Sequence, residues 1–350
     1  MRFEFTEDQL LLQSTVRDFL EGECGPERVR ALWEEGTGRS RDLWRQLAEV
    51  GLVGALVPEA HEGMGLDEVD FVLLAEEVGR AGLAEPVIGT AAVAAPLLAE
   101  LGSADLAERW LKPLAVGDAI VAVGHPVSPF VDDAHVADWL LLFHDGAVHA
   151  VAPGDATLTP QRANDPARRI QSVAFAPGDA TRLADGDAAR ALADAALDRG
   201  ALACAAGLVG AADRLIALAV DYAGQRQQFG VPIGSFQAVK HMLADAKVKL
   251  EYARPLVYRA AHSVANAGPR RSAHVSMAKT AAGEAASRAA RVSLQVHGAI
   301  GYTWEQDVHI WMRRAASLDH GWGLPRFHRQ RMADFALAEG APLGAGATFL

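Results

Sequence analysis

A glycine-rich loop between two stretches of helical pattern carries the first side chains that could bind a cofactor. It reads Asp221-Tyr-Ala-Gly-Gln-Arg226-Gln-Gln-Phe229-Gly-Val-Pro-Ile-Gly-Ser-Phe-Gln237. Arg226 is always charged, and its guanidinium can donate two hydrogen bonds to a phosphate. Phe229 can cover a flat ring, and Gln237 lies near the start of the next helix, where free backbone N–H groups favour anions. The pattern also fits a plain helical hairpin with a solvated Arg226 and a core Phe229, and by itself it favours that alternative.

A second glycine-rich segment reads Gln295-Val-His-Gly-Ala-Ile-Gly-Tyr-Thr-Trp-Glu305. Glycines at this position end a helix and permit a ligand to approach the backbone closely. Thr303 is expected to cap the next helix, whose first turn then carries Glu305. A glycine-rich corner between two helices is the alternative interpretation.

Long helices are predicted on both sides of these segments. Apolar residues recur at helical spacing in five stretches, residues 187–222, 237–267, 272–296, 304–316 and 325–339. Short connections make long consecutive helices antiparallel, which predicts a four-helix bundle. The N-terminal third also has helical patterns, at 7–21, 41–50, 67–79 and 91–101, the last with a kink or break at Pro96.

The middle of the chain has a different pattern. Short apolar or alternating runs separated by Pro, Gly and Asp predict a small β domain. The sequence His144-Asp-Gly-Ala147 predicts a hairpin, because Asp-Gly supplies the positive φ of a tight turn. The expected fold is therefore α+β and mainly α. It has an N-terminal helical domain (1–117), a reduced β domain (118–185), a C-terminal helical bundle (186–339) and a tail (340–350).

Composition narrows the classes of function. The 350 residues carry a formal net charge of -11, which disfavours a nucleic-acid binder, although a few Arg side chains suffice for an anionic ligand. The sequence contains no uncharged apolar run of about 18 residues, so no membrane span is expected. The acidic residues at its start are unlike those of a signal peptide. Cys24 and Cys204 are the two cysteines, without a metal or disulfide pattern, and neither a Gly-x-Ser-x-Gly nor a His-Glu-x-x-His motif occurs. We expect a cytoplasmic protein that binds small molecules and no metal.

Together, the two glycine-rich segments resemble those of the acyl-CoA dehydrogenase family. That family has an Arg-x-x-Phe-Gly-x-x-Ile/Leu-x-x-x-Gln loop, a helix with Lys-His/Ala-x-Leu-Ala-Asp, and a later Gln-x-x-Gly-Gly-x-Gly-Tyr/Phe-Thr run. The matching residues here are Arg226 to Gln237, Lys240 to Asp245, and Gln295 to Thr303, with Ala299 in place of the second glycine. Residues 44–59 and 73–80 also resemble family segments, so the likeness covers nearly the whole chain.

The resemblance implies FAD as cofactor and assigns it binding residues. In the family, the Arg, Phe and Gln of the loop reach across a subunit interface to the pyrophosphate and adenosine half of FAD. The Gln-x-x-Gly-Gly run contacts the same half. The implied FAD-binding residues are Arg226, Phe229, Gln237, Gln295, Val296, His297, Gly298 and Ala299.

The catalytic glutamate of the family has no counterpart at either of its two usual positions. One position aligns with Trp322 and the other with Gly200, and neither residue is a base. Asp198 lies about 200° around the helix from residue 200. Asp319 is the other nearby carboxylate, and His320 and His328 are bases by chemistry alone.

The segment that holds the flavin ring in the family is also replaced, by Val123-Gly-His-Pro-Val-Ser-Pro129, in a shortened β domain. With these two losses, the chain resembles the small non-catalytic subunits of heteromeric bacterial acyl-CoA dehydrogenases that act on steroid or ring-bearing acyl-CoAs. The resemblance implies a full-length partner subunit, an assembly with two chains of each kind, and electron-transfer flavoprotein as an acceptor. Two alternatives stay open. One is a self-sufficient homodimer with a displaced base such as Asp319, and the other is a non-enzymatic scaffold.

Overall fold

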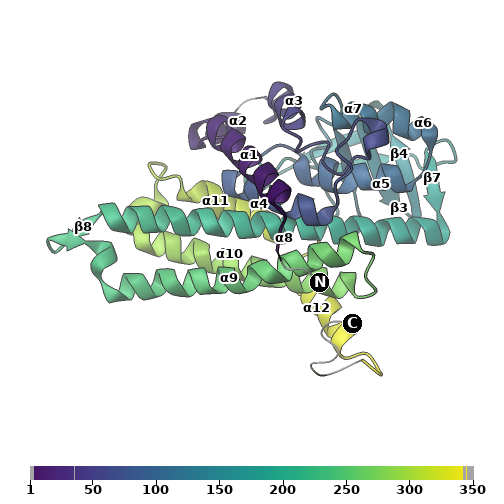
Figure 1. The fold of residues 1–350 in the computed structure, drawn as a ribbon. Coiled ribbons are helices and arrows are strands. Elements are labelled where there is room, and N and C mark those ends of the chain that lie inside the picture. The colour runs from purple at the N-terminus through teal and green to yellow at the C-terminus, as the bar shows by residue number, and fades with distance from the viewer. Residues whose placement is uncertain (1–3, 35, 342–343, 345–350) are drawn as a thin grey trace.

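The computed structural model describes residues 4–34, 36–341 and 344, and it confirms the predicted α+β, mainly α fold (Figure 1). The N-terminal region packs above the long helices of the C-terminal region, and the β-region lies at one end. Helices of the N-terminal region are α1 (Glu7–Glu23), α2 (Pro26–Glu34), α3 (Arg41–Glu49), η1 (Glu59–His61), α4 (Glu68–Ala81), η2 (Ile88–Ala94), α5 (Ala95–Glu100), α6 (Ala104–Leu106), η3 (Ala107–Leu111) and α7 (Lys112–Ala115).

Pro96 does not break the helix predicted around it. Residues Ile88–Ala94 form a π-helix that continues directly into α5, and Pro96 lies in the first turn of α5. A proline ring clashes with the carbonyl four residues earlier and cannot donate a hydrogen bond. The wider π turn accommodates both defects, so the chain stays helical through Glu100.

The β-region contains two small sheets. Strands β1 (Val121–Gly124), β3 (Trp139–His144), β4 (Ala147–Val151) and β7 (Arg182–Asp185) form one, in the order β1-β3-β4-β7. Strands β2 (Val131–Asp132), β6 (Ile170–Phe175) and β5 (Ala156–Gln161) form the other, and η4 (Pro153–Asp155) precedes β5. The predicted hairpin is confirmed, because β3 and β4 pair antiparallel around Asp145 and Gly146, which have φ of 46° and 74°.

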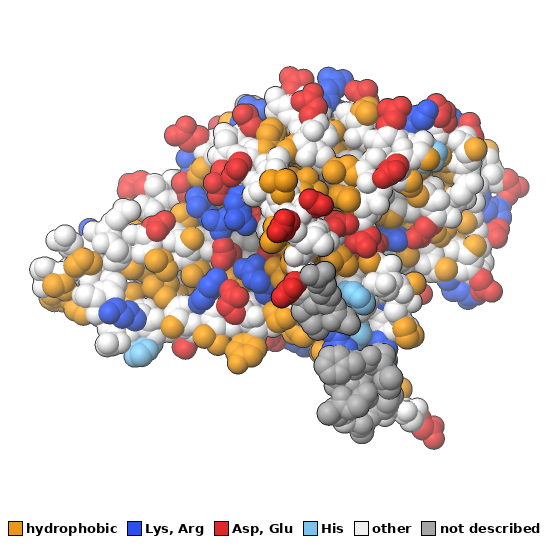
Figure 2. Space-filling view, in the orientation of Figure 1, with side chains coloured by type: hydrophobic (Ala, Val, Ile, Leu, Met, Phe, Trp, Pro, Cys, Tyr) orange, Lys and Arg blue, Asp and Glu red, His pale blue; other side chains and the backbone are white. Residues whose placement is uncertain are grey.

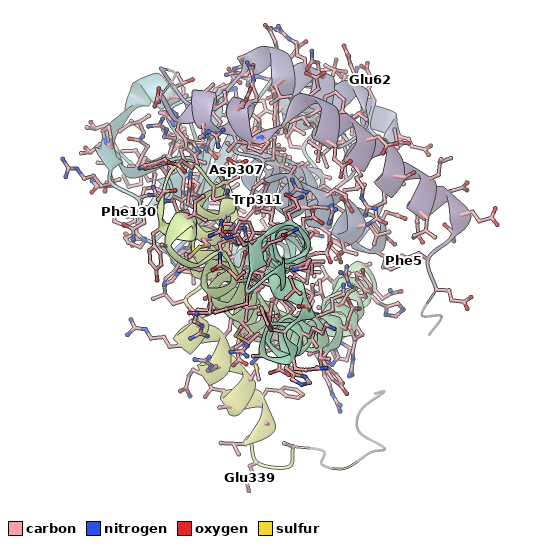
Figure 3. All side chains as sticks on the ribbon, turned by 90° about the vertical axis from the view of Figure 1, so that its left-hand side faces the viewer. Phe5, Glu62, Phe130, Asp307, Trp311 and Glu339 are labelled. Atoms are coloured by element: carbon pink, nitrogen blue, oxygen red, sulfur yellow. The ribbon has the colours of Figure 1, made fainter. Side chains whose placement is uncertain are left out.

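The C-terminal region is a bundle around α8 (Gly186–Gln225), α9 (Gln237–Ala265) and α10 (Arg271–His297), joined by α11 (Val308–His320). A short hairpin, β8 (Gln227–Gln228) and β9 (Val231–Pro232), and η5 (Ile233–Ser235) connect α8 to α9. The turn η6 (Gly298–Tyr302) follows α10, and α12 (Pro325–Ala336) projects below the bundle (Figures 1 and 3). The predicted tail 340–350 lies mostly outside the described residues.

The predicted start of α11 is wrong. The helix begins at Val308, after Asp307, and Thr303 does not cap it. Instead, the Thr303 hydroxyl donates to the Ile300 carbonyl and accepts from the Glu305 N–H, within the preceding turn.

The N-terminal region is fixed to the bundle by a close helix crossing. A β-carbon at Gly79 of α4 would overlap the carbonyl of Gly207 of α8, and one at Gly210 would overlap the carbonyl of Glu76. Glycine at these positions therefore permits direct backbone contact between the two helices. Trp311 of α11 donates from Nε1 to the Arg80 carbonyl (2.7 Å) and lies between the N-terminal helices and the bundle (Figure 3).

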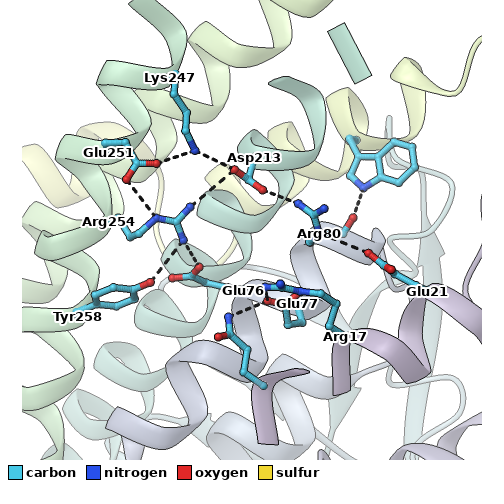
Figure 4. Close-up of polar contacts among 12 residues, drawn as sticks. Arg17, Glu21, Glu76, Glu77, Arg80, Asp213, Lys247, Glu251, Arg254 and Tyr258 are labelled. Atoms are coloured by element: carbon cyan, nitrogen blue, oxygen red, sulfur yellow. Dashed lines mark hydrogen bonds and ion pairs between the residues drawn. The ribbon is translucent and has the colours of Figure 1, made fainter. Parts of the chain in front are cut away.

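A polar network surrounds this crossing (Figure 4). Glu77 of α4 accepts two hydrogen bonds from Arg17 of α1, and Glu76 pairs with Arg254 of α9. Burial raises the pKa of Glu76 to about 7. The network continues through Asp213 of α8, which pairs with Arg80, Lys247 and Arg254. Four helices are thus tied together by charged groups as well as by apolar packing.

Helix α8 is the one described helix that is long and apolar enough to cross a membrane, and most of its apolar stretch is buried inside the protein. A core helix of a bundle has the same composition.

Candidate functional site

Arg226, Phe229 and Gln237 lie together at the end of the bundle that carries β8 (Figure 1). Phe229 is 91% exposed and has φ of 55°, so the alternative of a core Phe229 is wrong. The Arg226 backbone closes the hairpin, since its carbonyl accepts from the Ile233 N–H (2.8 Å), and its exposed side chain has no hydrogen bond or ion pair to another described residue. Gln237 is exposed in the first turn of α9. Hydrophobic side chains are visible on this tip in Figure 2.

The second segment ends at the same tip. His297 of α10 stacks on Tyr222 of α8 with ring centroids 4.4 Å apart, so the C-terminal ends of the two helices are neighbours. Its Nδ1–H donates to the Ser293 carbonyl (2.8 Å), and burial lowers the pKa of His297, which keeps the imidazole neutral. The His297 side chain therefore holds the two helix ends together.

The other residues of this segment differ in exposure. Val296 is buried, whereas Gln295 and Ala299 are exposed. Gly298 has φ of 64° and ψ of -140°, a conformation that is essentially restricted to glycine. The backbone at Gly298 and the side chain of Gln295 are thus available to a ligand, while the Val296 and His297 side chains serve the bundle.

The described residues of the tip expose groups that could bind an anion, and they form no enclosing wall around them. An unpaired guanidinium, an exposed aromatic ring and a glycine corner fit a phosphate-bearing ligand with a flat group. A ligand held only by these exposed groups remains open to solvent on its other side. The residues therefore fit one part of FAD, the part that the sequence resemblance assigned to them.

A separate cavity lies where the N-terminal region, the β-region and the bundle meet. Its walls are largely apolar, with Val78 and Leu83, Val121 and Val123, and Leu318 and Trp322 contributed by the three regions in turn. The replaced flavin-ring segment also lines it, through His125, Val127 and Ser128. These polar side chains are already engaged. His125 bonds to the Ala193 carbonyl and the Val127 N–H, and the Ser128 hydroxyl bonds to the Phe130 backbone.

Trp322 lines this cavity, and its indole packs against Gly200, the other position without a base. A β-carbon at Gly200 would overlap the Trp322 indole ring. Two positions 122 residues apart in the chain (322 minus 200) are thus adjacent in space. The indole and the glycine fill the place where either position could present a carboxylate.

The alternative bases lie elsewhere. The Asp319 carboxylate is directed at Gly283 of α10 and does not line the cavity. Asp198 is fully buried and bonds to Arg271, Arg331 and Ser272. His328 is also fully buried, and both of its ring nitrogens are hydrogen-bonded, while His320 is exposed. Burial lowers the pKa of His328 to about 4.

The cavity does contain carboxyl groups that the sequence did not single out. Asp132 accepts two hydrogen bonds from Arg168, and Asp133 pairs with Arg39. Glu85 accepts from the Ser40 N–H (3.0 Å), and burial raises its pKa to about 7. Its second oxygen is enclosed and has no partner among the described residues. The neighbouring charges Asp132-Asp133 and Arg168-Arg169 were the available sequence signal. Asp132 and Asp133 are thus paired with arginines, and burial disfavours the charged form of Glu85.

Family models match most of the chain. Residues 6–118 match the acyl-CoA dehydrogenase N-terminal domain, and residues 190–337 match the acyl-CoA dehydrogenase C-terminal domain. The chain belongs to the acyl-CoA dehydrogenase family.

Among described residues, no group of three or more His, Cys, Asp or Glu could hold a metal ion.

Relatives of full length support this membership. The chain is 35% identical over 329 residues to acyl-CoA dehydrogenase IpdE2 of Mycolicibacterium smegmatis, covering 93% of this chain and 98% of the relative. Among solved structures, the ChsE4-ChsE5 complex of Mycobacterium tuberculosis is similar, with 27% identity and a TM-score of 0.84, covering 98% of this chain and 100% of that chain. A glutaryl-CoA dehydrogenase of Mycobacterium smegmatis, solved in complex with FADH2, shares the fold at 18% identity and a TM-score of 0.85, over 97% of each chain.

Proposed function

We propose that this chain is a subunit of an FAD-dependent acyl-CoA dehydrogenase and completes the FAD site of a full-length partner subunit. The reaction of the assembly is the α,β-dehydrogenation of an acyl-CoA thioester. FAD, when bound, supplies the hydride acceptor for that reaction. This chain contributes the phosphate and adenosine side of the site, and the partner contributes the base and the pocket for the flavin ring.

The observation that carries the proposal is the separation of two features in one chain. The tip keeps Arg226, Phe229 and Gln237 exposed and without an enclosing wall. In contrast, the two positions at which the family carries its base are occupied by Trp322, which lines the cavity, and by Gly200, which contacts the Trp322 indole. A chain with an intact cofactor grip and no base at either position of the family's glutamate fits half of a shared site better than a complete one.

Two of the relatives agree with a heteromeric assembly. The ChsE4-ChsE5 structure is a complex of two different chains, and another neighbour, at 26% identity and a TM-score of 0.85, is a steroid acyl-CoA dehydrogenase composed of Tcur3481 and Tcur3483. By analogy, we expect two chains of each kind, a steroid-derived or ring-bearing acyl group, electron-transfer flavoprotein as acceptor and a cytoplasmic location.

Co-purification with a candidate partner tests the proposal. The chain is co-expressed with a full-length acyl-CoA dehydrogenase from the same gene neighbourhood, and absorbance at flavin wavelengths is measured on the complex and on each chain alone. We expect stable flavin in the complex and none in this chain alone. The shared site would be contradicted if the two chains form no complex. It would also be contradicted if the isolated chain carries flavin whose absorbance falls when an acyl-CoA is added.

Arg226→Ala then probes the grip itself. Loss of a charge-assisted hydrogen bond of about 1.5–3 kcal/mol weakens flavin retention by about 10- to 150-fold. Arg190→Ala is the matched control, because Arg190 is an exposed arginine in the first turns of the same helix, remote from the tip. Equal flavin loss in both variants would show that Arg226 has no specific role.

A further inference from the structure

The Trp322 indole lines the cavity and packs against Gly200 of α8. Helix α8 has room for the ring because residue 200 is glycine. A β-carbon at this position would overlap the indole. His125 of the β-region approaches the ring from the other side, with ring centroids 5.7 Å apart. The indole therefore lies between the bundle and the β-region.

The backbone around Trp322 is held in this position. Trp322 has φ of 54°, an uncommon value for a residue with a bulky side chain. Its carbonyl accepts a hydrogen bond from Nε2 of His328 (3.0 Å), and the Asp319 carbonyl accepts one from Nζ of Lys279 (2.8 Å). His328 and Lys279 are both buried. Strain of this kind persists only where the surroundings fix it, so the closed position of the ring is built into the loop.

The residues of α8 and α11 that line the cavity with the indole carry no carboxylate. Cys204, Gly207 and Leu318 line the cavity beside it, and burial raises the pKa of the Cys204 thiol to about 11. The part-exposed pair Asp132–Arg168 and the buried pair Asp133–Arg39 also line the cavity. Glu85 is a further carboxyl group of the wall, and burial disfavours its charged form.

We infer that Trp322 excludes an acyl thioester from this chain's own cavity, so that the assembly takes its substrate only at the partner's site. This inference rests on the proposed function and adds a residue that determines where substrate binds. A smaller residue at position 322 vacates the space beside Gly200. The apolar walls there then accept an acyl chain.

Calorimetric titration of the isolated full chain with octanoyl-CoA tests the inference. We expect no saturable binding to the wild type and saturable binding of one equivalent per chain to Trp322→Ala. Trp304→Ala is the matched control, because Trp304 is 63% exposed and does not line the cavity. It should behave as the wild type. Equal binding by wild type and Trp322→Ala, or binding by neither, overturns the inference.

A thermal-unfolding cycle keeps the inference testable if an enlarged cavity collapses. Gly200→Ala should lower the Tm of the wild type because the new methyl meets the indole, and it should lower the Tm much less in a Trp322→Ala background. Additive effects would show that the two residues do not meet. Flavin retention with the partner should be unchanged in Trp322→Ala. If the wild-type complex retains no flavin, the proposed function is wrong. That result is independent of whether octanoyl-CoA binds to Trp322→Ala.

Discussion

Glu85 gives the stability of this protein a pH dependence that a single substitution should remove. The residue is 5% exposed and accepts one backbone hydrogen bond from Ser40, while its second oxygen has no partner among the described residues. Burial raises its pKa from the ordinary 4.5 to about 7. The folded protein therefore holds a proton on Glu85 at pH values at which the unfolded chain has released it.

The sign and size of the effect follow from linkage. Between the two pKa values the folded state binds more protons than the unfolded state, so the free energy of unfolding falls as pH rises. At about 1.36 kcal/mol per pH unit, the full loss from 4.5 to about 7 is about 3.4 kcal/mol. About 2.5 kcal/mol of this loss falls between pH 5 and pH 8.

Glu85→Gln isolates the contribution. Glutamine cannot ionise, and its carbonyl oxygen can still accept the Ser40 N–H. Urea unfolding monitored by far-UV circular dichroism gives the free energy of unfolding of both proteins at pH 5, 6, 7 and 8. We expect the variant to gain about 2.5 kcal/mol on the wild type over this range. Glu49→Gln, at an exposed position of α3, is the control. The free energy of unfolding of this variant should differ from that of the wild type by the same amount at every pH.

A constant difference between Glu85→Gln and the wild type would refute the reasoning. It would mean that Glu85 keeps one protonation state across the range. A difference that shrinks with rising pH would show that the nearby Arg39 stabilises the carboxylate more than burial destabilises it.

Two further substitutions test the bundle and the tip. Asp198→Asn should lower the free energy of unfolding by about 2–3 kcal/mol in the same urea assay, because it leaves Arg271 and Arg331 without their buried carboxylate. An unchanged midpoint would show that solvent replaces the pairing. Gly298→Ala should cost about 1–3 kcal/mol, because a β-carbon disfavours its backbone conformation, and should reduce flavin retention in the complex. Retention equal to that of the wild type would exclude Gly298 from the cofactor site.

Local signals in the sequence predicted the elements well where neighbouring residues decide the conformation. The β3–β4 hairpin depends on Asp145 and Gly146 alone, and both adopt the positive φ that the turn requires. The helices on either side of the tip differ from the predicted ranges by a few residues at their ends, where hydrogen bonding to neighbouring turns determines the boundary.

The start of α11 was predicted wrongly because a tertiary contact competes with helical spacing. The Arg313 guanidinium lies 5.1 Å from the centroid of the Trp304 ring. In a continuous helix, residues nine positions apart would be separated by about 13.5 Å along the axis. The chain therefore turns at 304–307 so that the indole can fold back onto α11.

The contact between Gly200 and Trp322 could likewise not be predicted from the sequence pattern. Each residue could be recognised separately as occupying the position of a missing glutamate. Their contact depends on how the loop after α11 packs on the middle of α8, which no short-range pattern encodes. The charges in the cavity wall were missed for the same reason, since Glu85 and Asp133 come from different regions of the chain.

The conformation of the tip is unfavourable for an isolated chain. Phe229 is nearly fully exposed and has a positive φ, so its ring gains little burial and its backbone occupies a disfavoured region. A neighbouring Phe236 ring, with centroids 6.2 Å apart, is its one aromatic contact among the described residues. Exposed aromatic surface beside an unpaired arginine is stabilised when a second surface covers it. The proposed function predicts that such a surface belongs to the partner subunit and its cofactor.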